Sequence, residues 1–256
     1  MRIHRQNYHD IERIIEFDFV RATEAAALNS LPWLGRGEKE KADAAACDAL
    51  RGMFDLMNIC GEVVIGEGIK DDAPGIFKGE QLGTWLPGSP PFDIALDPID
   101  GTTNISKGAP NSISCIAAAM APSIADSGVD LYFGIGGAPE AVLAAAGIKC
   151  LGGDMQCVMW PRDEKERKSL IADGHEADLG RVFFADDLAN GKNIIFCATG
   201  ISDSALLRGV KSQGATATTY SILMRAKSRT VRFIRASHDL QNKTIRLRSD
   251  NREHRI

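Results

Sequence analysis

The stretch Phe92–Asn104 constrains this chain more than any other, because an apolar strand runs directly into a turn that carries two carboxylates. Its sequence is F-D-I-A-L-D-P-I-D-G-T-T-N, which places Asp97 and Asp100 three residues apart. Pro98 has no N–H to donate, so we expect the strand to end at Asp97. Gly101 permits the backbone to approach a ligand closely, and the N–H groups that follow it can face an anion.

Asp97 and Asp100 repel each other unless a positive charge lies between them. Carboxylate oxygens of this kind favour a hard divalent cation, Mg²⁺ or Mn²⁺. The alternative is a solvated turn rich in aspartate, and this stretch alone leaves both interpretations open.

Size and composition describe an ordinary globular protein. The chain has 256 residues, of which 44% are hydrophobic and 25% are charged, enough for one large or two small domains. No apolar run reaches the length of a membrane span, and the N-terminus lacks a signal-peptide core. Six cysteines without a C-x-x-C pair favour free thiols in a reducing compartment. We therefore expect a cytoplasmic protein that contacts no membrane.

The net charge of −4 conceals a basic C-terminal part, because residues 225–256 hold ten Lys or Arg and three Asp or Glu. This part has few aromatic residues and no nucleic-acid motif, so we expect no nucleic-acid partner. A basic face for an anionic substrate, a subunit contact and a solvated sheet edge are the interpretations left open.

Two helices are expected before the first strand. Asp10 is a candidate N-cap for a helix that runs to about Leu28, and a second helix spans about Lys39–Asn58. Asp43 lies one turn inside the second helix, among alanines. From this local pattern alone we expect Asp43 to lie on the surface.

Carboxylates recur beside glycines at the ends of apolar strands. Glu67 follows the apolar triplet Val63–Ile65 and stands between two glycines, and Glu140 lies in a glycine turn that opens a helix. Ligands in layered α/β structures gather at such strand ends. The glycine turn lacks the third glycine and the downstream acid of a dinucleotide fingerprint, so we do not assign it that role.

The remaining elements follow from apolar runs and turn residues. We expect strands over Phe92–Asp97, Ser112–Ala119, Val129–Phe133, Asn193–Gly200, and a strand pair of Tyr220–Arg225 with Thr230–Ala236. We expect helices over Ala141–Ala146, Asp163–Ile171 and Leu206–Gly209. The last dozen residues are polar and are expected to fray. Met120–Gly128 is the best boundary, which divides the chain into domains 1–119 and 120–256.

This inventory of residues suits metal-assisted hydrolysis of a phosphate ester. The acids at or near glycine-flanked strand ends are Asp43, Glu67, Asp71, Asp97, Asp100 and Glu140, with Lys39 and Thr102 beside them. Two metal ions about 3.5–4 Å apart polarise phosphoryl oxygens and lower the pKa of an attacking water. A hydroxyl next to a carboxylate can orient that water and take its proton.

The segment D-P-I-D-G-T-T at 97–103 resembles the motif of the lithium-sensitive, metal-dependent phosphatase superfamily, which includes inositol monophosphatases and fructose-1,6-bisphosphatases. Further motifs resemble the class II (GlpX-type) fructose-1,6-bisphosphatases and follow that family's order over most of the chain. They are Phe19–Ala27, Trp33–Gly37, Lys39-x-x-x-Asp43, Val64–Gly68, Asp71-x-Ala-Pro74, Gly134–Glu140, Ala198–Ile201 and Met224–Arg232.

The resemblance implies a role for each matching residue. The ligands of Mn²⁺ (or Mg²⁺) would be Asp43, Glu67, Asp97, Asp100 and Glu140. The substrate would be bound by Lys39, Asp100, Gly101, Thr102 and Gly137. The catalytic residues would be Asp71, Asp97 and Thr102, with Thr102 positioning the nucleophilic water.

The resemblance also implies a fold and an activity. The fold would be a layered α-β-α-β-α sandwich of the α/β (α+β) class, with an N-terminal metal-binding half and a C-terminal half that supplies Glu140. The activity would be hydrolysis of the 1-phosphate of fructose 1,6-bisphosphate to fructose 6-phosphate in gluconeogenesis, with sedoheptulose 1,7-bisphosphate as a further substrate. A homodimer or homotetramer is expected.

The chain departs from this family in its length. Members carry a long segment between the strands expected at Ser112–Ala119 and Val129–Phe133, and only Met120–Gly128 stands there in this chain. The missing segment supplies a Tyr, a basic triplet and an Asp-Gly-Asp motif that hold the sugar bisphosphate. We therefore expect an intact metal site, an incomplete sugar-phosphate site and a strand edge that a partner subunit covers.

Two alternatives follow from this departure and from the superfamily. The first is an internally truncated, weakly active or inactive homologue that acts as an interaction subunit. The second is a related inositol or sugar monophosphatase, whose downstream Trp-Asp metal motif this chain lacks.

Overall fold

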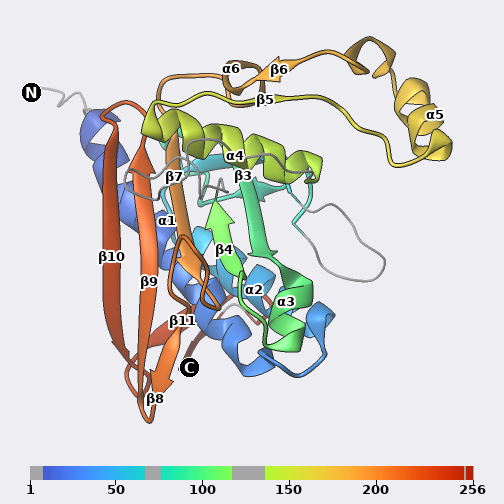
Figure 1. Ribbon diagram of the computed structural model, residues 1–256. Helices are drawn as coiled ribbons and strands as arrows, with labels where there is room; N and C mark the ends of the chain where they lie inside the picture. Colours follow the sequence, from blue (N-terminus) through green and yellow to red (C-terminus); the bar gives the residue numbers. More distant parts are fainter. Residues whose placement is uncertain (1–7, 67–75, 117–135, 251, 256) are drawn as a thin grey trace, which may run out of the picture.

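The computed structural model describes residues 8–66, 76–116, 136–250 and 252–255. Within these ranges, helices lie on both faces of a central mixed sheet, which confirms the expected α/β class (Figure 1). None of the helices in these ranges is long and apolar enough to cross a membrane.

The helices of the described ranges include two long N-terminal ones, close to where the sequence predicts them. The α-helices are α1 (Tyr8–Ser30), α2 (Lys39–Phe54), α3 (Thr102–Lys107), α4 (Ala138–Leu151), α5 (Glu164–Ala172) and α6 (Ala185–Leu188). Two 3-10 turns are η1 (Leu31–Trp33) and η2 (Glu176–Asp178).

Strands from both halves of the chain enter one sheet. Its order is β10-β9-β7-β4-β3-β1-β2, with β8 beside β9. The strands are β1 (Cys60–Ile65), β2 (Gln81–Leu82), β3 (Pro91–Asp100), β4 (Ile113–Ile116), β7 (Ile195–Gly200), β8 (Lys211–Gln213), β9 (Thr216–Arg225) and β10 (Thr230–Asp239). Only β1 and β3 are parallel; the other neighbours are antiparallel. Two small ribbons pair β5 (Gln156–Cys157) with β6 (Phe183–Phe184) and β11 (Thr244–Leu247) with β12 (Arg252–Arg255).

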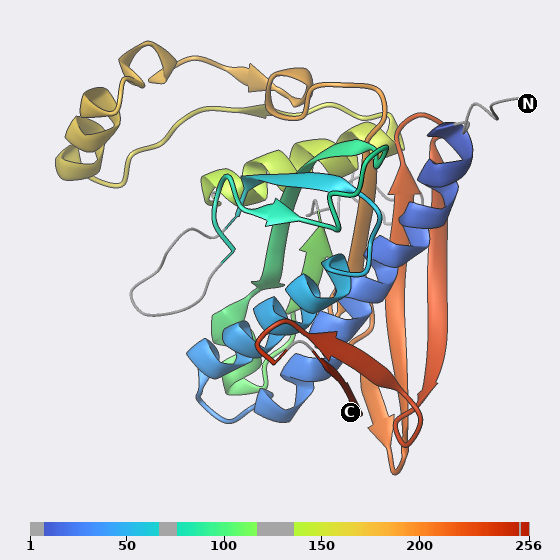
Figure 2. The ribbon, with the colours of Figure 1, turned by 180° about the vertical axis from the view of Figure 1, so that it is seen from behind.

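The two faces of the sheet carry different helices. Cys197 on β7 belongs to the buried core that includes α1 and α2, whereas its neighbours Phe196 and Ala198 belong to the core that includes α4. Successive side chains of a strand point to opposite faces, so α4 covers one face and α1 with α2 covers the other. Figures 1 and 2 show these two helix layers from opposite sides.

Strand β3 continues past Pro98, which corrects the expected strand end at Asp97. The pairing with β1 stops at Ala95, so among the described residues no strand on that side requires an N–H from Pro98. On the other side, the pairing with β4 is irregular between Asp97 and Asp100. The proline therefore sits in a bulge-like interruption, and β3 delivers Asp100 as its last residue.

Strand β4 shows how the sheet is built next to the expected missing segment. Its residues 113–116 pair with β3 on one side and with β7 on the other, so both of its edges are occupied. The expected open strand edge therefore does not occur at β4. The strand expected over Val129–Phe133 lies outside the described residues, and so does the whole of Met120–Gly128.

Two local expectations in the C-terminal half are wrong. Leu206–Gly209 forms no helix but a turn, in which the Ser204 hydroxyl accepts a hydrogen bond from the Leu207 N–H at 3.0 Å. The C-terminal residues are not frayed, because β11 and β12 form a hairpin that packs on α2 and buries Ile245. The two misses have different reasons. Local hydrogen bonds between Ser204 and Leu207 form the first structure, whereas the hairpin is ordered by a distant helix that the local pattern does not record.

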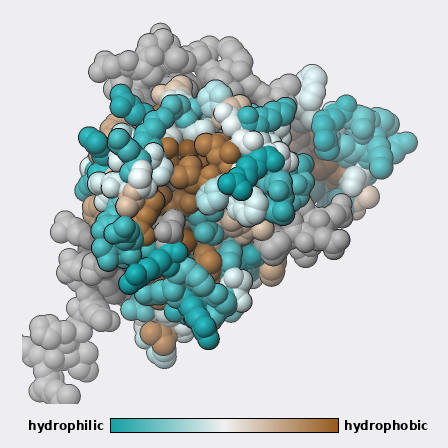
Figure 3. All heavy atoms as spheres, turned by 90° about the horizontal axis from the view of Figure 1, so that it is seen from below, coloured by the Kyte–Doolittle hydropathy of each residue, from teal (hydrophilic) through white to brown (hydrophobic). Residues whose placement is uncertain are grey.

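The chain between α4 and β7 forms an arm that runs along the outside of the body (Figures 1 and 2). Along Gln156–Trp160 exposed and half-buried residues alternate, as in an extended strand. Four large apolar side chains of the arm are exposed, namely Val158, Trp160, Val182 and Phe184. On the body, apolar side chains also reach the surface in the middle of the lower face, ringed by hydrophilic ones (Figure 3).

Candidate active site

The end of β3 and the start of α3 form a tight turn that presents the predicted residues. Asp97 is only 5% exposed, and it lies opposite Cys115 of β4. Gly101 is the N-cap of α3 with φ 87°, a left-handed conformation that favours glycine. A Cβ at this position would also lie 2.5 Å from the Asn111 carbonyl oxygen. Thr102 follows as the first residue of α3 and is half-buried.

The residues around Asn111 close this turn from the other side. Ser112 donates its hydroxyl to the Gly101 carbonyl oxygen at 3.0 Å, and the Asn104 amide donates to the Asn111 carbonyl oxygen at 3.1 Å. The turn is thereby held between β3 and β4. These hydrogen bonds restrict the backbone of residues 100–102.

The buried thiol of Cys115 is affected by the negative charge at this turn. Its Sγ donates to the Asp97 carbonyl oxygen at 3.7 Å. Burial is the main reason why the pKa of Cys115 is raised well above its usual value, and the carboxylates of Asp97 and Asp100 raise it further. Both acids therefore act on the same buried spot, which is the setting in which a cation would be attracted.

Helix α2 brings Asp43 to this part of the molecule. It packs against β3 and α3, and two hydrogen bonds join the loop before it to α3: Gly35 N–H to the Ile105 carbonyl, and Gly37 N–H to the Ser106 carbonyl, both 2.8 Å. Asp43 is 8% exposed, which corrects the expectation that it lies on the surface.

Lys39 is the first residue of α2 and is exposed. Its ammonium group lies 3.5 Å from Glu40, in a solvent-exposed ion pair. Such a pair contributes little, so the Lys39 side chain is available for an anion.

Helix α4 presents Glu140 from the face of the sheet on which Asp97 also lies. Gly137 is the N-cap of α4, and Glu140 stands in its first turn. A Cβ at position 137 would overlap Oε2 of Glu140, so the glutamate side chain folds back over the helix start. This Oε2 is buried, and among the residues described it has no hydrogen-bond partner.

The described residues include carboxylate oxygens of the kind that bind a divalent cation, but they do not by themselves complete a site. Asp43 and Asp97 are buried carboxylates, and Oε2 of Glu140 is a buried oxygen without a partner in the described ranges. Carboxylate oxygens are the ligands that Mg²⁺ and Mn²⁺ prefer. No group of three or more His, Cys, Asp or Glu residues in those ranges is arranged to hold a metal ion. Glu67 and Asp71, the other predicted acids, lie outside the described residues.

Sequence reasoning missed the residues that hold the turn. The sequence predicts a strand that includes Ser112 and Cys115, but it indicates no role for these residues or for Asn111 beside Asp97 and Gly101. The register of β4 against β3 places these residues beside the turn. This register depends on long-range pairing, which the sequence does not show directly.

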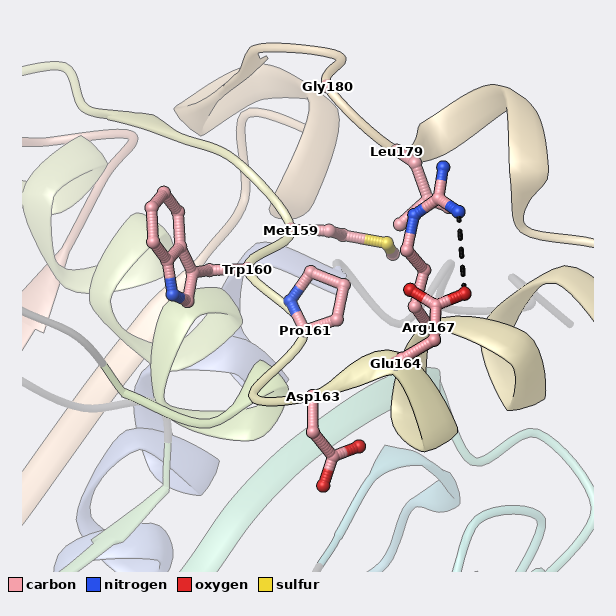
Figure 4. A pocket seen from close by; sticks show the side chains of 8 residues that line it. All are labelled: Met159, Trp160, Pro161, Asp163, Glu164, Arg167, Leu179 and Gly180. Carbon is pink, nitrogen blue, oxygen red and sulfur yellow. Dashed lines mark ion pairs between the residues drawn. The ribbon is translucent and has the colours of Figure 1, made fainter.

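A separate pocket lies on the arm (Figure 4). Met159, Pro161 and Leu179 are among the residues that line it, together with the ion-paired Glu164 and Arg167. None of the lining residues belongs to the predicted set, so this pocket carries no support for the active site.

Comparison with known proteins identifies the family to which this chain belongs. Residues 13–127 and 116–238 both match the family described as bacterial fructose-1,6-bisphosphatase, glpX-encoded. The fructose-1,6-bisphosphatase class 2 of Haemophilus influenzae is 33% identical, over 91% of this chain and 98% of its own length. The fructose-1,6-bisphosphatase 1 class 2 of Escherichia coli K12 is 31% identical, over 91% of this chain and 97% of its own length. The chain therefore belongs to the GlpX-type, class 2 fructose-1,6-bisphosphatase family, which confirms the resemblance seen in its motifs.

The same comparisons locate the difference in length. The alignment with the Haemophilus influenzae relative runs over 328 positions, whereas this chain has 256 residues, so gaps must fall in this chain. The two matches to the family meet and overlap at residues 116–127. This is the place where the sequence predicts that a segment is missing.

Proposed function

We propose that this chain is a metal-dependent phosphatase that hydrolyses the 1-phosphate of fructose 1,6-bisphosphate to give fructose 6-phosphate. The observation that carries the proposal is the locked turn at Asp97–Thr102, in which a buried carboxylate, a second carboxylate, a left-handed glycine and a hydroxyl follow one another. Membership of the GlpX-type family supports the same substrate.

Each residue of the proposed site has a role that its chemistry supports. Asp43, Glu67, Asp97, Asp100 and Glu140 would hold Mn²⁺ or Mg²⁺. The bound cation supplies charge neutralisation at the phosphoryl oxygens and a lowered pKa for a bound water. The Thr102 hydroxyl orients the attacking water beside Asp97, and Asp71 assists as a further acid–base group.

The anion is bound by groups around the turn. The N–H groups from Gly101 onward face the phosphate, because a backbone in this conformation directs its donors to one side. Lys39 neutralises part of the phosphate charge from the exposed start of α2. Gly137 is the proposed substrate-contacting glycine, and its missing side chain leaves space that the Glu140 carboxylate occupies.

The wider arrangement is also a proposal. We place the two functional halves at residues 1–119 and 120–256, with one sheet running through both. We propose a homo-oligomer in the cytoplasm, and the apolar side chains on the lower face in Figure 3 support a contact between chains. Sedoheptulose 1,7-bisphosphate shares the reacting phosphate ester and is a second candidate substrate.

The alternative of an internally truncated, weakly active interaction subunit rests on one observation, the gaps that the alignment places in this chain. The alternative of an inositol or sugar monophosphatase has no comparable observation in its favour, because the relatives named above are fructose-1,6-bisphosphatases.

Phosphate release by the purified full chain tests the proposal. With Mn²⁺ and fructose 1,6-bisphosphate we expect phosphate release that EDTA abolishes and that Asp97→Asn reduces at least about 100-fold. Asp93→Asn on the same strand is the control and should retain activity. Absence of phosphate release, combined with Mn²⁺ binding to the wild-type chain, would favour the interaction subunit.

A further inference from the structure

Four charged side chains join the C-terminal hairpin to α2. Arg51 donates Nε and Nη2 to the carboxylate of Glu80, at 2.7 and 2.8 Å. Arg248 donates Nη1 to Oε1 of Glu80 at 2.9 Å, and Nε and Nη2 to the carboxylate of Asp55 at 3.1 and 2.6 Å. Glu80 is 8% exposed, so two arginines share one buried carboxylate. Bidentate arginine–carboxylate pairs of this kind fix geometry as well as contributing energy.

The hairpin also contacts the backbone of α2 directly. A Cβ on Gly52 would overlap the Arg246 carbonyl oxygen, so the strand of the hairpin lies against the helix itself. Ser249 donates its N–H and its hydroxyl to the carboxylate of Asp48, at 2.8 and 2.6 Å. Ile245 is buried against α1 and α2 in a small apolar cluster. These contacts seat the hairpin firmly on the helix.

Glu80 connects this cluster to β1. The Val63 N–H donates to the Glu80 carbonyl oxygen at 2.9 Å, and the Gly79 N–H donates to the Val63 carbonyl oxygen at 2.7 Å. The Glu80 side chain therefore ties α2 and the hairpin to the strand that runs beside it. Helix α2 carries Asp43, and β1 pairs in parallel with β3, which carries Asp97.

The hairpin lies beyond the part of the chain that matches the family. That match ends at residue 238, whereas β11 begins at Thr244. The contact between Arg248 and Glu80 therefore joins a segment outside the matched range to two elements inside it.

We propose that Arg248 is a positioning residue for the metal site, which sets the placement of α2 relative to β1 through Glu80 and Asp55. This inference rests on the proposed function, because Asp43 and Asp97 matter as ligands only there. Without Arg248, Asp55 loses its bidentate partner, and Glu80 keeps Arg51 and the Phe77 N–H, which donates to its Oε2 at 3.4 Å. Helix α2 then loses one of its ties to β1, and a shift of the helix would move Asp43, which lies near its other end.

The test measures Mn²⁺ binding to the full chain by isothermal titration calorimetry at 20 °C, with circular dichroism to show that each variant is folded. We expect Arg248→Met to raise the Kd for Mn²⁺ by roughly 5-fold, less than the ~10–100-fold typical of groups that touch metal ligands directly. Arg248→Lys should give a smaller increase, because its ammonium group keeps the positive charge although it cannot form the bidentate pair. Arg252→Met, in the other strand of the same hairpin, is the matched control and should leave the Kd unchanged.

The outcomes separate this inference from the proposed function. If Arg248→Met melts earlier but binds Mn²⁺ as tightly as the wild type, the hairpin is a structural support only and the inference is wrong. If the wild-type chain itself binds no Mn²⁺, the metal site of the proposed function is wrong as well. If Arg248→Met does not fold at 20 °C, Arg248→Lys decides, and an unchanged Kd there overturns the inference.

Discussion

Gly137 and Glu140 are packed so closely that a Cβ at position 137 would overlap Oε2 of the glutamate. Gly137→Ala should therefore displace the Glu140 carboxylate while leaving the helix intact, because alanine is tolerated at φ −73°. We expect Mn²⁺-dependent phosphatase activity to fall roughly 10–100-fold, as for groups that orient metal ligands, with little change in Tm.

The neighbouring glycine provides the control for this prediction. A Cβ at Gly136 would lie 3.6 Å from the Glu140 Cβ, an ordinary van der Waals distance. Gly136→Ala should keep most of the activity. Equal losses in the two variants would show that the helix start, and not the Glu140 carboxylate, is sensitive to substitution.

Gly101 is constrained both by its backbone conformation and by the space around it. Its φ of 87° and the Asn111 carbonyl oxygen 2.5 Å from a Cβ oppose any side chain. Gly101→Ala should lower the free energy of unfolding by about 2–4 kcal/mol, since strain and overlap add. Gly214→Ala, with φ 60° and open space around it, should cost only about 1 kcal/mol. Urea denaturation of both variants measures the difference, and equal costs would contradict the role assigned to Asn111.

The stability of the fold should depend on pH through a buried polar group between α1 and the sheet. Thr219 donates its hydroxyl to Oε1 of Glu24 at 3.0 Å and lies 2.8 Å from Nε2 of His238. Since the hydroxyl proton goes to Glu24, Nε2 of the His238 ring donates to Thr219. Burial, assisted by Lys243, lowers the pKa of His238 to about 4.

A histidine with a lowered pKa in the folded state stabilises the protein above its unfolded pKa of 6.5, and this contribution is lost as the pH falls toward about 4. The loss should reach up to about 3 kcal/mol. Burial raises the pKa of Glu24, so its protonation favours the folded state and offsets part of the loss at the acidic end.

Chemical denaturation at several pH values measures this dependence. We expect unfolding free energy to fall between pH 6.5 and pH 5, and His238→Gln, which retains a donor to Thr219, should flatten this slope. His254, whose side chain is 39% exposed, is the control, and His254→Gln should leave the slope unchanged. A slope that survives in His238→Gln would assign the pH dependence to other groups.

The parts of this structure that the sequence predicts are those that neighbouring residues determine. The apolar alternation and turn of Tyr220–Ala236 produce the β9–β10 hairpin with Thr230 opposite Arg225, and the acids of the 97–103 motif lie at the end of β3. The interruption at Pro98 did not end the strand, because β1 had already stopped pairing at Ala95, and this depends on the register of another strand.

Contacts between distant residues account for what the sequence could not predict. Asp43 is buried because α2 packs on β3 and α3, although its neighbours in the helix are alanines, which fit a surface equally well. β4 pairs with β7, about 80 residues later, and no local pattern records that partner. The C-terminal hairpin is ordered by α2, which lies some 200 residues earlier in the chain.

Lys39 provides the last prediction, because it and Lys41 are similar exposed lysines on the same turn of α2. Lys39 pairs with Glu40, and Lys41 pairs with Glu38 and lies over the Trp33 ring, 5.3 Å from its centroid. Exposed ion pairs contribute at most about 1 kcal/mol, so neither substitution by methionine should change Tm by more than a few degrees.

If Lys39 binds the substrate phosphate, Lys39→Met should raise KM for fructose 1,6-bisphosphate by roughly 10-fold, the equivalent of one charge-assisted hydrogen bond of about 1.4 kcal/mol. Lys41→Met should leave KM unchanged, and steady-state kinetics at saturating Mn²⁺ distinguishes the two. A KM increase of the same size in both variants would indicate that the general positive charge of this helix start attracts the substrate, without a specific contact from Lys39.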